Sequence, residues 1–495
     1  MTPSFDISNK TRDAVAEEAF KEASQPVNTD VFGAEDHHDI KYKRLSWPLV
    51  AVLMIAEIVS NGMLSLPYSL ATVGMVPGLV IIVFLGVFAT YTSWLLVDFK
   101  LRHPEVHTMG DAGFIMFGPI GREVLSFGTL CFAIFACGGQ LLAGQVALAA
   151  LSDNKLCLML YTGIFAVPTL LCSLPRTFHG LGWISVASVL CIFVAGIVGM
   201  VGAGKSPDPD RAVRVAVTTD FYTAFVSITN PVFAYAGHFM FFVLMSEMKE
   251  PKHAIRAAYT LQSFATVYYA IFAAVMYGFI GSTVSSLAFS SLPPYWAKVS
   301  YGIAIPNFLL AGSLYAHTAC KVVFVRVFRN SKHLHSHTVL GWGVWVGLVV
   351  LANGLAFVLA VGVPIFTYLI GIAASLFAAW FTYGIAGMFW LHDSYHVGAG
   401  FSTWQRLWGQ TTLAMVTVVS GAFICVAGLW DAHVKSLLHQ FKGSRKLNDF
   451  SFKDEDVIIM TTETTAFLFF NDVYRSVRER KSRDPSKLFH AAGTS

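Results

Sequence analysis

The sequence predicts an all-α polytopic membrane protein. Of the 495 residues, 55% are hydrophobic and only 13% are charged, whereas a soluble globular chain carries about 25% charged residues. The charges are also unevenly spread, since no Asp, Glu, Lys or Arg lies between Glu57 and Asp98 or between Lys332 and Asp393. Such stretches exceed the ~20 apolar residues that cross a bilayer as a helix. They are far longer than the ~10 residues of a membrane β-strand, which excludes a β-barrel.

Apolar runs separated by charged residues, proline or glycine give about eleven predicted transmembrane helices. Lys and Arg are concentrated in the loops on the same side as the N-terminus, which places that terminus in the cytoplasm and, with eleven spans, the C-terminus outside. We expect residues 1–44 to be a disordered cytoplasmic tail, residues 45–431 the membrane domain and residues 432–495 a C-terminal tail. The predicted spans are about 49–70, 76–97, 123–151, 156–175, 181–203, 222–246, 260–281, 299–323, 338–361, 364–390 and 411–430.

Two motifs that suggest other functions are set aside on physical grounds. The stretch "GMVGAGKS" at 199–206 matches the phosphate-loop pattern, but that loop must follow a strand, and here it ends an apolar span. We expect these glycines to pack at a helix end. The stretch "HLHSH" at 333–337 lacks a carboxylate or thiolate partner, so a basic turn is favoured over a metal site. We expect no metal, no cofactor, no nucleic-acid partner, no obligate protein partner and no enzymatic activity.

Glu57 is the one charged residue that the sequence places deep inside a span, when residues at span ends are left out. It lies about nine residues into the first span, roughly 12–14 Å below the surface. A charge at that depth costs about 2.5–3.5 kcal/mol on insertion scales, and such acids usually mark ion or proton pathways. The structural alternative is a protonated Glu that merely hydrogen-bonds a neighbouring helix. We predict a proton-coupling role for Glu57.

Two spans contain residues that disfavour a continuous helix at mid-membrane. In the first, "SNGMLSLP" at 60–67 follows the acid directly; in the sixth, "SITNPVFAYAGHFM" at 227–240 holds Asn230-Pro231 and Gly237. Irregular backbone at this depth is tolerated only where protein or a water-filled cavity satisfies it. The two spans occupy corresponding positions if spans 1–5 and 6–10 are repeats. Paired interruptions of this kind point to the substrate site of an inverted-repeat transporter.

The chemistry of two facing helix breaks suits a zwitterion. Half-helix N-termini offer free N–H groups to a carboxylate, and the freed carbonyls suit an ammonium group. An amino acid carries both groups. The acid beside the first break would let a proton travel with the substrate, and His238 in the second break is a second candidate proton group because imidazole changes charge near neutral pH. A packed, hydrogen-bonded histidine is the alternative for His238.

Four motifs in order resemble the amino acid/auxin permease family, and the resemblance covers about residues 45–431. The stretch "KYKRLSWPLVAVLMIAEIVSNGMLSLP" at 41–67 is similar, more narrowly, to the fungal neutral amino acid permeases. That resemblance implies a proton symporter of the plasma membrane. The four motifs are "GMLSLPYSLATVG" at 62–74, "DAGFIMFGPIGR" at 111–122, "FAYAGHFMFFVLMSEMKEP" at 233–251 and "LYAHTACKVVFVRVF" at 314–328.

The resemblance implies about eleven helices in a leucine-transporter-like 5+5 inverted repeat plus one extra helix, with the substrate between spans 1 and 6. Sodium-coupled animal members have an Asn in span 1 that helps to hold the ion, and Ala56 stands at the matching position here. This departure favours protons over sodium. The implied substrate residues are Ser60, Asn61, Gly62 and Met63 on the carboxylate side and Thr229, Asn230 and Phe233 on the facing segment.

The function expected from the sequence is secondary active transport. We expect proton-coupled symport of neutral aliphatic or aromatic amino acids by alternating access, driven by the proton gradient, because no acid other than Glu57 faces the membrane interior. The partners are then a small-molecule amino acid and the lipid bilayer. An amino-acid sensor on the same fold, without sustained flux, and proton-coupled transport of a different small solute are the alternatives. The plasma membrane is the expected location, with the vacuolar membrane as the alternative.

Overall fold

The computed structural model describes residues 31–33, 35, 39–329, 331–363, 365–396 and 400–446. Within these residues, nine helices are long and apolar enough to cross a membrane, and the bent pair Trp47–Ile58 and Asn61–Val73 makes a tenth. The predicted span at 156–175 corresponds to a shorter apolar helix, α7 (Leu158–Cys172). Each of the eleven predicted spans therefore coincides with a helical element, and the prediction of an all-α membrane protein is confirmed.

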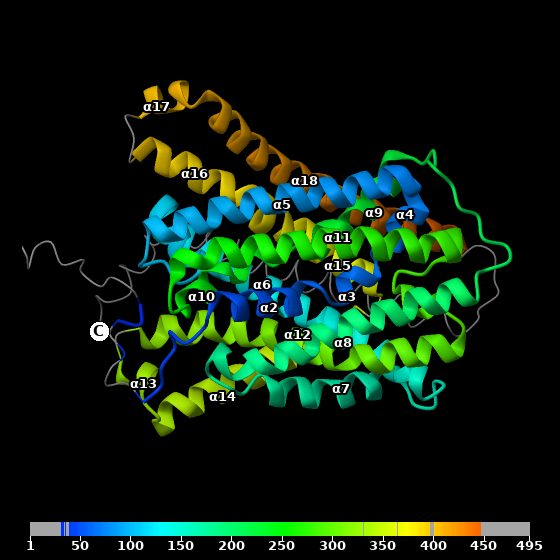
Figure 1. Ribbon diagram of the computed structural model, residues 1–495, viewed down its shortest axis with the longest axis horizontal. Coiled ribbons are helices and arrows are strands. Elements are labelled where there is room, and N and C mark those ends of the chain that lie inside the picture. Colours follow the sequence, from blue (N-terminus) through cyan, green and yellow to red (C-terminus); the bar gives the residue numbers. More distant parts are fainter. Residues whose placement is uncertain are drawn as a thin grey trace, which may run out of the picture.

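The helices run side by side along the long axis of the molecule (Figure 1). Helix α2 lies inside the bundle, where α8, α11 and α12 pack against it. Helix α6 (Met109–Leu151) is bent at Gly118. The long helices without such a break are α5 (Met75–Arg102), α8 (Phe178–Lys205), α11 (Ala254–Ile280), α12 (Pro294–Phe328), α14 (Val339–Gly362) and α18 (Trp408–Lys446).

Three spans are built from several pieces. The first consists of α2 (Trp47–Ile58), α3 (Asn61–Leu64) and α4 (Leu66–Val73). The sixth consists of α9 (Phe221–Ala234), the 3₁₀ turn η1 (His238–Met240) and α10 (Phe241–Ser246). The tenth consists of α15 (Phe366–Ala373), the π-helix η5 (Ala374–Gly384) and α16 (Ile385–His396). The short connecting elements are η2 (Pro251–His253), η3 (Gly281–Thr283), η4 (Ala288–Ser291), α13 (Lys332–His335) and α17 (Phe401–Arg406).

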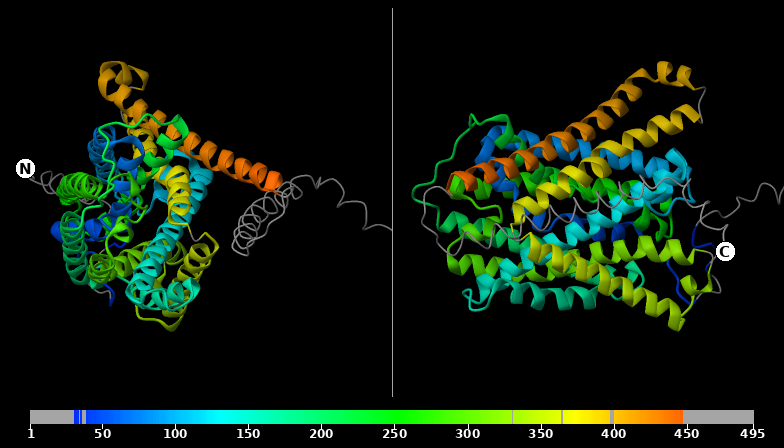
Figure 2. Two further views of the ribbon diagram at one scale, coloured as in Figure 1. Left: turned by 90° about the vertical axis from the view of Figure 1, so that its right-hand side faces the viewer. Right: turned by 180° about the vertical axis from the view of Figure 1, so that it is seen from behind.

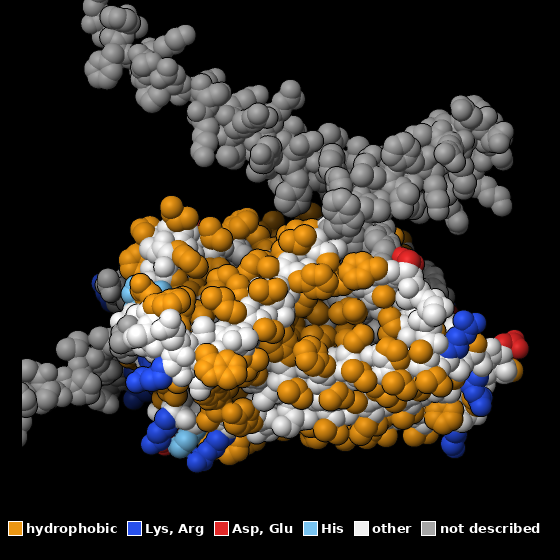
Figure 3. Space-filling view, turned by 90° about the horizontal axis from the view of Figure 1, so that it is seen from above, with side chains coloured by type: hydrophobic (Ala, Val, Ile, Leu, Met, Phe, Trp, Pro, Cys, Tyr) orange, Lys and Arg blue, Asp and Glu red, His pale blue; other side chains and the backbone are white. Residues whose placement is uncertain are grey.

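The outer surface of the bundle is apolar. Hydrophobic side chains cover the middle of the face shown in Figure 3, while Lys and Arg gather toward its two ends. Large apolar side chains such as Phe84, Phe127 and Trp183 are 63%, 68% and 75% exposed. Soluble monomers rarely expose contiguous apolar patches above a few hundred Å². The surface therefore faces lipid, and the chain is a multi-pass membrane protein.

Helix α6 begins at Met109, well before the predicted start near residue 123. Thr108 and Asp111 form a capping box that starts the helix. Gly118 adopts φ +64° directly before Pro119 and bends the helix there, a conformation that glycine takes without steric cost. The predicted span begins only after this Gly-Pro pair, whereas the helix extends through it with a bend.

The glycines of the phosphate-loop-like stretch lie in the last turns of α8. A Cβ added at Gly199 would lie 2.5 Å from the ring of Phe289, and one added at Gly202 would lie 2.7 Å from the side chain of Trp296. These positions therefore need glycine for close helix packing. The prediction that they pack at a helix end is confirmed.

Buried charge also occurs near span ends, which were left out when Glu57 was singled out. Glu247 and Lys321 are 0% and 1% exposed and form an ion pair with each other. Lys321 also lies over the rings of Tyr42 and Phe178, with its Nζ 4.9 and 4.7 Å from the ring centroids. Lys321 lies near the end of the predicted span 299–323, whereas α12 continues to Phe328.

The described part of the N-terminal region packs against the bundle. The rings of Phe32 and Tyr42 stack with centroids 4.4 Å apart, and both residues are 1% exposed. The Tyr42 hydroxyl donates to the carbonyl of Leu334 at 3.0 Å. Residues 1–44 were expected to be a disordered tail, and residues 1–30 of that range lie outside the described residues. At the other end, α18 runs to Lys446, and the rest of the expected C-terminal tail lies outside the described residues.

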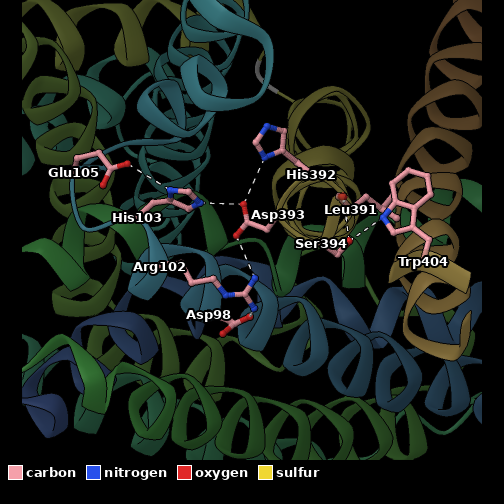
Figure 4. Close-up of polar contacts among 9 residues, drawn as sticks. All are labelled: Asp98, Arg102, His103, Glu105, Leu391, His392, Asp393, Ser394 and Trp404. Atoms are coloured by element: carbon pink, nitrogen blue, oxygen red, sulfur yellow. Dashed lines mark hydrogen bonds and ion pairs between the residues drawn. The ribbon is translucent and has the colours of Figure 1, made fainter. Parts of the chain in front are cut away.

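An ionic cluster joins the ends of α5 and α16 (Figure 4). The carboxylate of Asp393, 2% exposed, accepts hydrogen bonds from His103 Nε2 at 3.0 Å and Arg102 Nη1 at 3.3 Å. His392 Nδ1 lies 3.5 Å from the same carboxylate, and His103 Nδ1 lies 3.4 Å from Glu105. Beyond this cluster, α17 and the adjoining ends of α16 and α18 stand away from the rest of the bundle (Figures 1 and 2).

Candidate functional site

The first helix break separates α2 from α3. Helix α2 ends at Ile58, and Ser60 has non-helical dihedrals of φ −145° and ψ −135°. The segments on either side are bent by 44°. Ser, Asn and Gly side chains compete with or fail to support helical pairing, so the local sequence accounts for the break. The predicted interruption of span 1 is confirmed.

The second break follows α9, which ends at Ala234. The amide of Ala236 bonds to the carbonyl of Phe233 at 3.0 Å, and that of Gly237 bonds to the carbonyl of Tyr235 at 3.0 Å. These short-range bonds replace the helical pattern before η1 begins. The predicted interruption of span 6 is confirmed as well.

The two breaks touch each other through glycines. A Cβ added at Gly62 would lie 3.1 Å from the Cα of Ala234. Reciprocally, a Cβ added at Gly237 would lie 2.4 Å from Ile58 Cδ1 and 3.3 Å from Glu57 Oε2. Each break therefore has a glycine where the other comes closest, and the two form a single site.

The last carbonyls of α2 receive hydrogen bonds from side chains of other helices. A helix end leaves up to four carbonyls without an intrahelical partner, and burial makes such orphan groups costly. Here three consecutive carbonyls have donors from α11 and α12, so the broken backbone is held open in a defined shape. The pairs are Asn307 Nδ2 with Ala56 O (3.2 Å), Tyr315 OH with Glu57 O (3.2 Å) and Tyr269 OH with Ile58 O (2.8 Å).

Gln140 of α6 holds the other side of the first break. Ser60 Oγ donates to Gln140 Oε1 at 3.0 Å, and Gln140 Nε2 donates to Asn61 Oδ1 at 3.0 Å. These bonds leave Asn61 Nδ2 as a buried donor without a partner. A buried donor in this position is costly unless an acceptor joins it. The site therefore offers an amide N–H to an acceptor such as a carboxylate.

Glu57 lies beside both breaks. Its side chain is fully buried, and neither carboxylate oxygen has a hydrogen-bond partner among the residues that the structure describes. Its Oε2 lies 3.3 Å from the Cβ position of Gly237 in the second break. An unpaired carboxylate ion is strongly disfavoured in such a place, so the group requires a proton or a cation.

His238 points toward α5 instead of toward Glu57. Its Nε2 lies 3.0 Å from the carbonyl of Ala89 and 2.9 Å from Ser93 Oγ. The hydrogen bonds match the structural alternative weighed for this residue, and its proton role stays a prediction.

The predicted substrate residues do not all face one space. Ser60, Asn61, Gly62 and Phe233 meet where the breaks touch. Asn230 instead donates to Ser69 Oγ of α4 at 3.3 Å, one turn before the second break. The remaining two residues also lie elsewhere: Thr229 Oγ1 is 3.9 Å from the Cβ position of Gly371 in α15, and Met63 Cε is 3.6 Å from that of Gly196 in α8.

Aromatic rings gather next to the second break, around the buried ring of Phe132 in α6. They come from α9, η1 and η5, so four elements converge there. The π-helix η5 contributes two rings, and π-helical turns frequently occur at functional sites. The neighbourhood is apolar and suits an uncharged side chain. The centroid distances from Phe132 are 6.3 Å to Phe233, 4.9 Å to Phe239, 6.1 Å to Phe377 and 6.4 Å to Phe381.

Comparison with known sequences identifies the family. The profile of the family described as "Transmembrane amino acid transporter protein" matches residues 43–434. The chain belongs to this family. It is similar to a "Transmembrane transporter" of Gibberella moniliformis (30% identity over 412 residues, 81% of this chain and 86% of the relative). It is also similar to the "N amino acid transport system protein" of Neurospora crassa (29% identity over 360 residues, 71% and 76%).

Solved structures of transporters share the fold of this family member. MhsT in complex with L-phenylalanine aligns with a TM-score of 0.54 at 12% identity, over 79% of this chain and 100% of MhsT. A Na⁺-coupled sialic acid symporter aligns with a TM-score of 0.50 at 11% identity, over 82% and 94%. The fold is therefore leucine-transporter-like, as the resemblance implied. Membership of the amino acid transporter family makes the protein a transporter and not an enzyme.

Three residues of this transporter's site were missed by the sequence analysis: Gln140, Tyr269 and Asn307. All three are uncharged polar side chains in spans 3, 7 and 8, whereas the predicted site was built from a buried charge in span 1 and from the residues around the breaks in spans 1 and 6. Asn307 had a local signal, since it follows Pro306 at mid-span. No group of three or more His, Cys, Asp or Glu side chains placed to hold a metal ion occurs in the part of the chain that the structure describes.

Proposed function

We propose that the protein is a proton-coupled symporter that carries neutral amino acids across a membrane by alternating access. The observation that carries this proposal is the position of Glu57. Within the described part of the chain, its buried carboxylate has no hydrogen-bond partner on either oxygen, and it lies against both helix breaks. Such a group is stable with a proton bound and unstable without one. Uptake and release of that proton beside the substrate would couple the two fluxes.

The hydrogen bonds at the end of α2 support a proton over a sodium ion. Oxygen ligands, including freed backbone carbonyls, coordinate Na⁺ in transporters with broken helices. Here the carbonyls of Ala56 and Glu57 already receive bonds from the side chains of Asn307 and Tyr315. The carboxylate of Glu57 is then the group best placed to accept the coupling ion.

The site chemistry supports a zwitterionic substrate. Asn61 Nδ2 is a buried donor for the substrate carboxylate, and the carbonyls of Ile58 and Ala234 at the two breaks are acceptors for its ammonium group. The rings around Phe132 suit an aliphatic or aromatic side chain. The N. crassa relative named as an amino acid transport system, and the L-phenylalanine bound to MhsT, agree with this class of substrate.

The proton gradient would supply the driving force without a cofactor. Each positive charge that moves inward gains about 2.3 kcal/mol per 100 mV of membrane potential. At 1.4 kcal/mol per tenfold, one proton supports roughly 40-fold accumulation per 100 mV.

Uptake of radiolabelled neutral amino acids into cells that express the protein tests this proposal. We expect uptake to rise from pH 7.5 to pH 5, to collapse with a protonophore and to be independent of sodium. The Glu57→Gln variant should exchange substrate but not concentrate it. Glu123→Gln, which removes an exposed acid paired with Arg326, is the matched control and should accumulate substrate normally.

Three outcomes would contradict the proposal. Accumulation by Glu57→Gln would remove this residue from the coupling step. Uptake that depends on sodium would show that Na⁺, and not the proton, is the coupling ion. Binding without accumulation under every condition would favour an amino-acid sensor on the same fold.

We propose the plasma membrane as the location, in line with the resemblance to fungal neutral amino acid permeases. A fluorescently tagged chain should label the cell outline and react with a membrane-impermeant reagent. Label on the vacuolar membrane would overturn this location.

A further inference from the structure

One hydroxyl group links the two helix breaks. The Tyr269 hydroxyl of α11 lies 2.8 Å from the carbonyl of Ile58 and 2.9 Å from that of Ala234. These are the last residues of α2 and α9, so each carbonyl belongs to the helix end at one break. The side chain of Tyr269 is fully buried.

The hydroxyl has fewer hydrogens to donate than there are carbonyl acceptors around it. A phenol carries a single hydrogen, whereas the two carbonyls are both acceptors. The carbonyl of Ile58 also accepts from the backbone amide of Ser60 at 2.9 Å. When the hydroxyl donates to the carbonyl of Ala234, its oxygen therefore lies against Ile58 O without supplying a hydrogen to that carbonyl's second lone pair. A group with several N–H donors corrects this deficit, because it can serve both carbonyls and also donate to the hydroxyl oxygen. An ammonium group has three such donors.

The ring of Tyr269 is held in place by its neighbours. Tyr235 packs against it edge to face, with centroids 5.2 Å apart. The hydroxyl of Tyr235 is itself bound to the carbonyl of Ile82 at 3.1 Å. The Tyr269 hydroxyl is therefore fixed between the two breaks by packing, and it sets the separation of their carbonyls.

We propose that Tyr269 is a positioning residue that replaces the substrate's ammonium group at the two breaks when the carrier returns without substrate. This inference rests on the proposed transport of amino acids. In the substrate-free carrier the hydroxyl keeps the carbonyls of Ile58 and Ala234 paired, so the two breaks move together. When an amino acid binds, its ammonium group supplies the missing donors and the hydroxyl becomes a secondary partner.

The ratio of net uptake to exchange distinguishes this role from a merely structural one, which would change both rates alike. Net uptake requires the carrier to return empty, whereas exchange of internal for external substrate cycles only the loaded carrier. Tyr269→Phe keeps the ring but removes the hydroxyl. In the empty carrier the carbonyl of Ala234 then loses its side-chain donor, while that of Ile58 keeps the amide of Ser60. We expect net uptake to fall about tenfold, because one buried carbonyl is left without a hydrogen bond. Exchange should stay within about twofold of wild type.

Tyr268→Phe is the matched control. Tyr268 is the preceding residue, but its hydroxyl donates to the carbonyl of Phe193 in α8 at 3.1 Å, away from both breaks. Net uptake and exchange should both remain near the wild-type values. All rates are normalised to the amount of protein at the cell surface.

Several results would overturn the inference. Equal losses of net uptake and exchange in Tyr269→Phe, or no loss in either, would show that the hydroxyl does not act in the empty carrier. Wild-type protein that exchanges no neutral amino acid would overturn the proposed function and this inference with it. Wild-type exchange together with an unselective Tyr269→Phe defect would overturn this inference alone.

A thermal unfolding measurement covers the case of a poorly folding variant. We expect saturating leucine or phenylalanine to raise the Tm of purified Tyr269→Phe more than that of wild type, because the ammonium group then supplies the lost donor. Recovery of folded variant only in the presence of substrate supports the same conclusion. Failure to recover it with and without substrate, or equal ligand-induced shifts, would contradict it.

Discussion

The carboxylate of Glu57 faces Gly237 across the contact between the two broken helices. A Cβ at Gly237 would lie 3.3 Å from Glu57 Oε2 and 2.4 Å from the Cδ1 of Ile58. The acid and the second break therefore share one small space that glycine keeps open. Movement of the second break would change the surroundings of the acid directly, which is the relationship that coupled transport needs.

Gly237→Ala should impair transport by closing this space. The added methyl group collides with Ile58, which is 4% exposed and has little room to adopt another rotamer. We expect uptake to fall about tenfold or more with a smaller loss of folded protein, since overpacking of this kind costs about 1–3 kcal/mol. The measurement is uptake per molecule at the cell surface. Gly343→Ala is the control, because nothing lies within 4 Å of its Cβ position. Wild-type uptake by Gly237→Ala would mean that the breaks do not need this close approach.

Gln140→Ala should weaken substrate binding. Without Gln140, Ser60 and Asn61 lose the bonds that orient them, so the free amide donor of Asn61 is no longer fixed. We expect KM for a neutral amino acid to rise about tenfold, the effect of roughly one lost hydrogen bond to a charged group, with a smaller change in maximal rate.

The matched control for this change lies in the same helix. Gln145 accepts a hydrogen bond from Thr162 at 2.6 Å, which ties α6 to α7 away from the breaks. Gln145→Ala should lower stability and leave KM unchanged. Equal KM values for Gln140→Ala and wild type would remove Gln140 from the site.

Breaking the buried ion pair between Lys321 and Glu247 should destabilise the protein. Removing one partner leaves an uncompensated buried charge, which costs about 3–5 kcal/mol. We therefore expect Lys321→Met to lower the thermal unfolding temperature and the yield of folded protein. Lys321→Met combined with Glu247→Gln should recover most of the loss, because Gln keeps an acceptor for the amide of Phe178, now 3.1 Å from Glu247 Oε2. A double variant as unstable as the single one would show that the pair's geometry, and not its charge balance, is what matters.

The sequence predicted the features that depend on short stretches of chain. The positions of the spans follow from apolar run length, and both breaks follow from local Ser-Asn-Gly and Asn-Pro chemistry. The bond between Gln140 and Asn61 joins residues 79 apart in the chain, and that between Tyr269 and Ile58 joins residues 211 apart. Such pairs depend on helix packing, and one sequence alone carries no signal for them.

The burial of Lys321 shows the same limit in another form. A lysine near the end of an apolar run is normally read as a loop residue, because it can reach water by extending its side chain. Here Glu247 and the rings of Tyr42 and Phe178 enclose it. Its environment comes from three distant segments, so the local sequence pointed the wrong way.

The link between α5 and α16 should weaken as the pH rises, because it includes His103. The hydrogen bond to the Asp393 carboxylate raises the pKa of His103 above its usual value. Burial lowers this pKa in part, whereas the negative charges of Asp393 and Glu105 raise it further. Arg102 and His392 also face the same carboxylate. A raised pKa means that this contribution to stability is fully present below about pH 6.5, the ordinary histidine value, and is lost as the pH rises through the folded-state value.

Thermal unfolding of the detergent-solubilised protein between pH 5.5 and pH 8.5 tests this sign. We expect His103→Gln to unfold at a lower temperature than wild type at pH 5.5, and the difference to shrink toward pH 8.5 as the wild-type imidazole loses its proton. In an Asp393→Asn background the same substitution should show little dependence on pH, because the charged acceptor is gone. A difference that grows with pH would mean that neutral His103 is the form that stabilises the junction of α5 and α16.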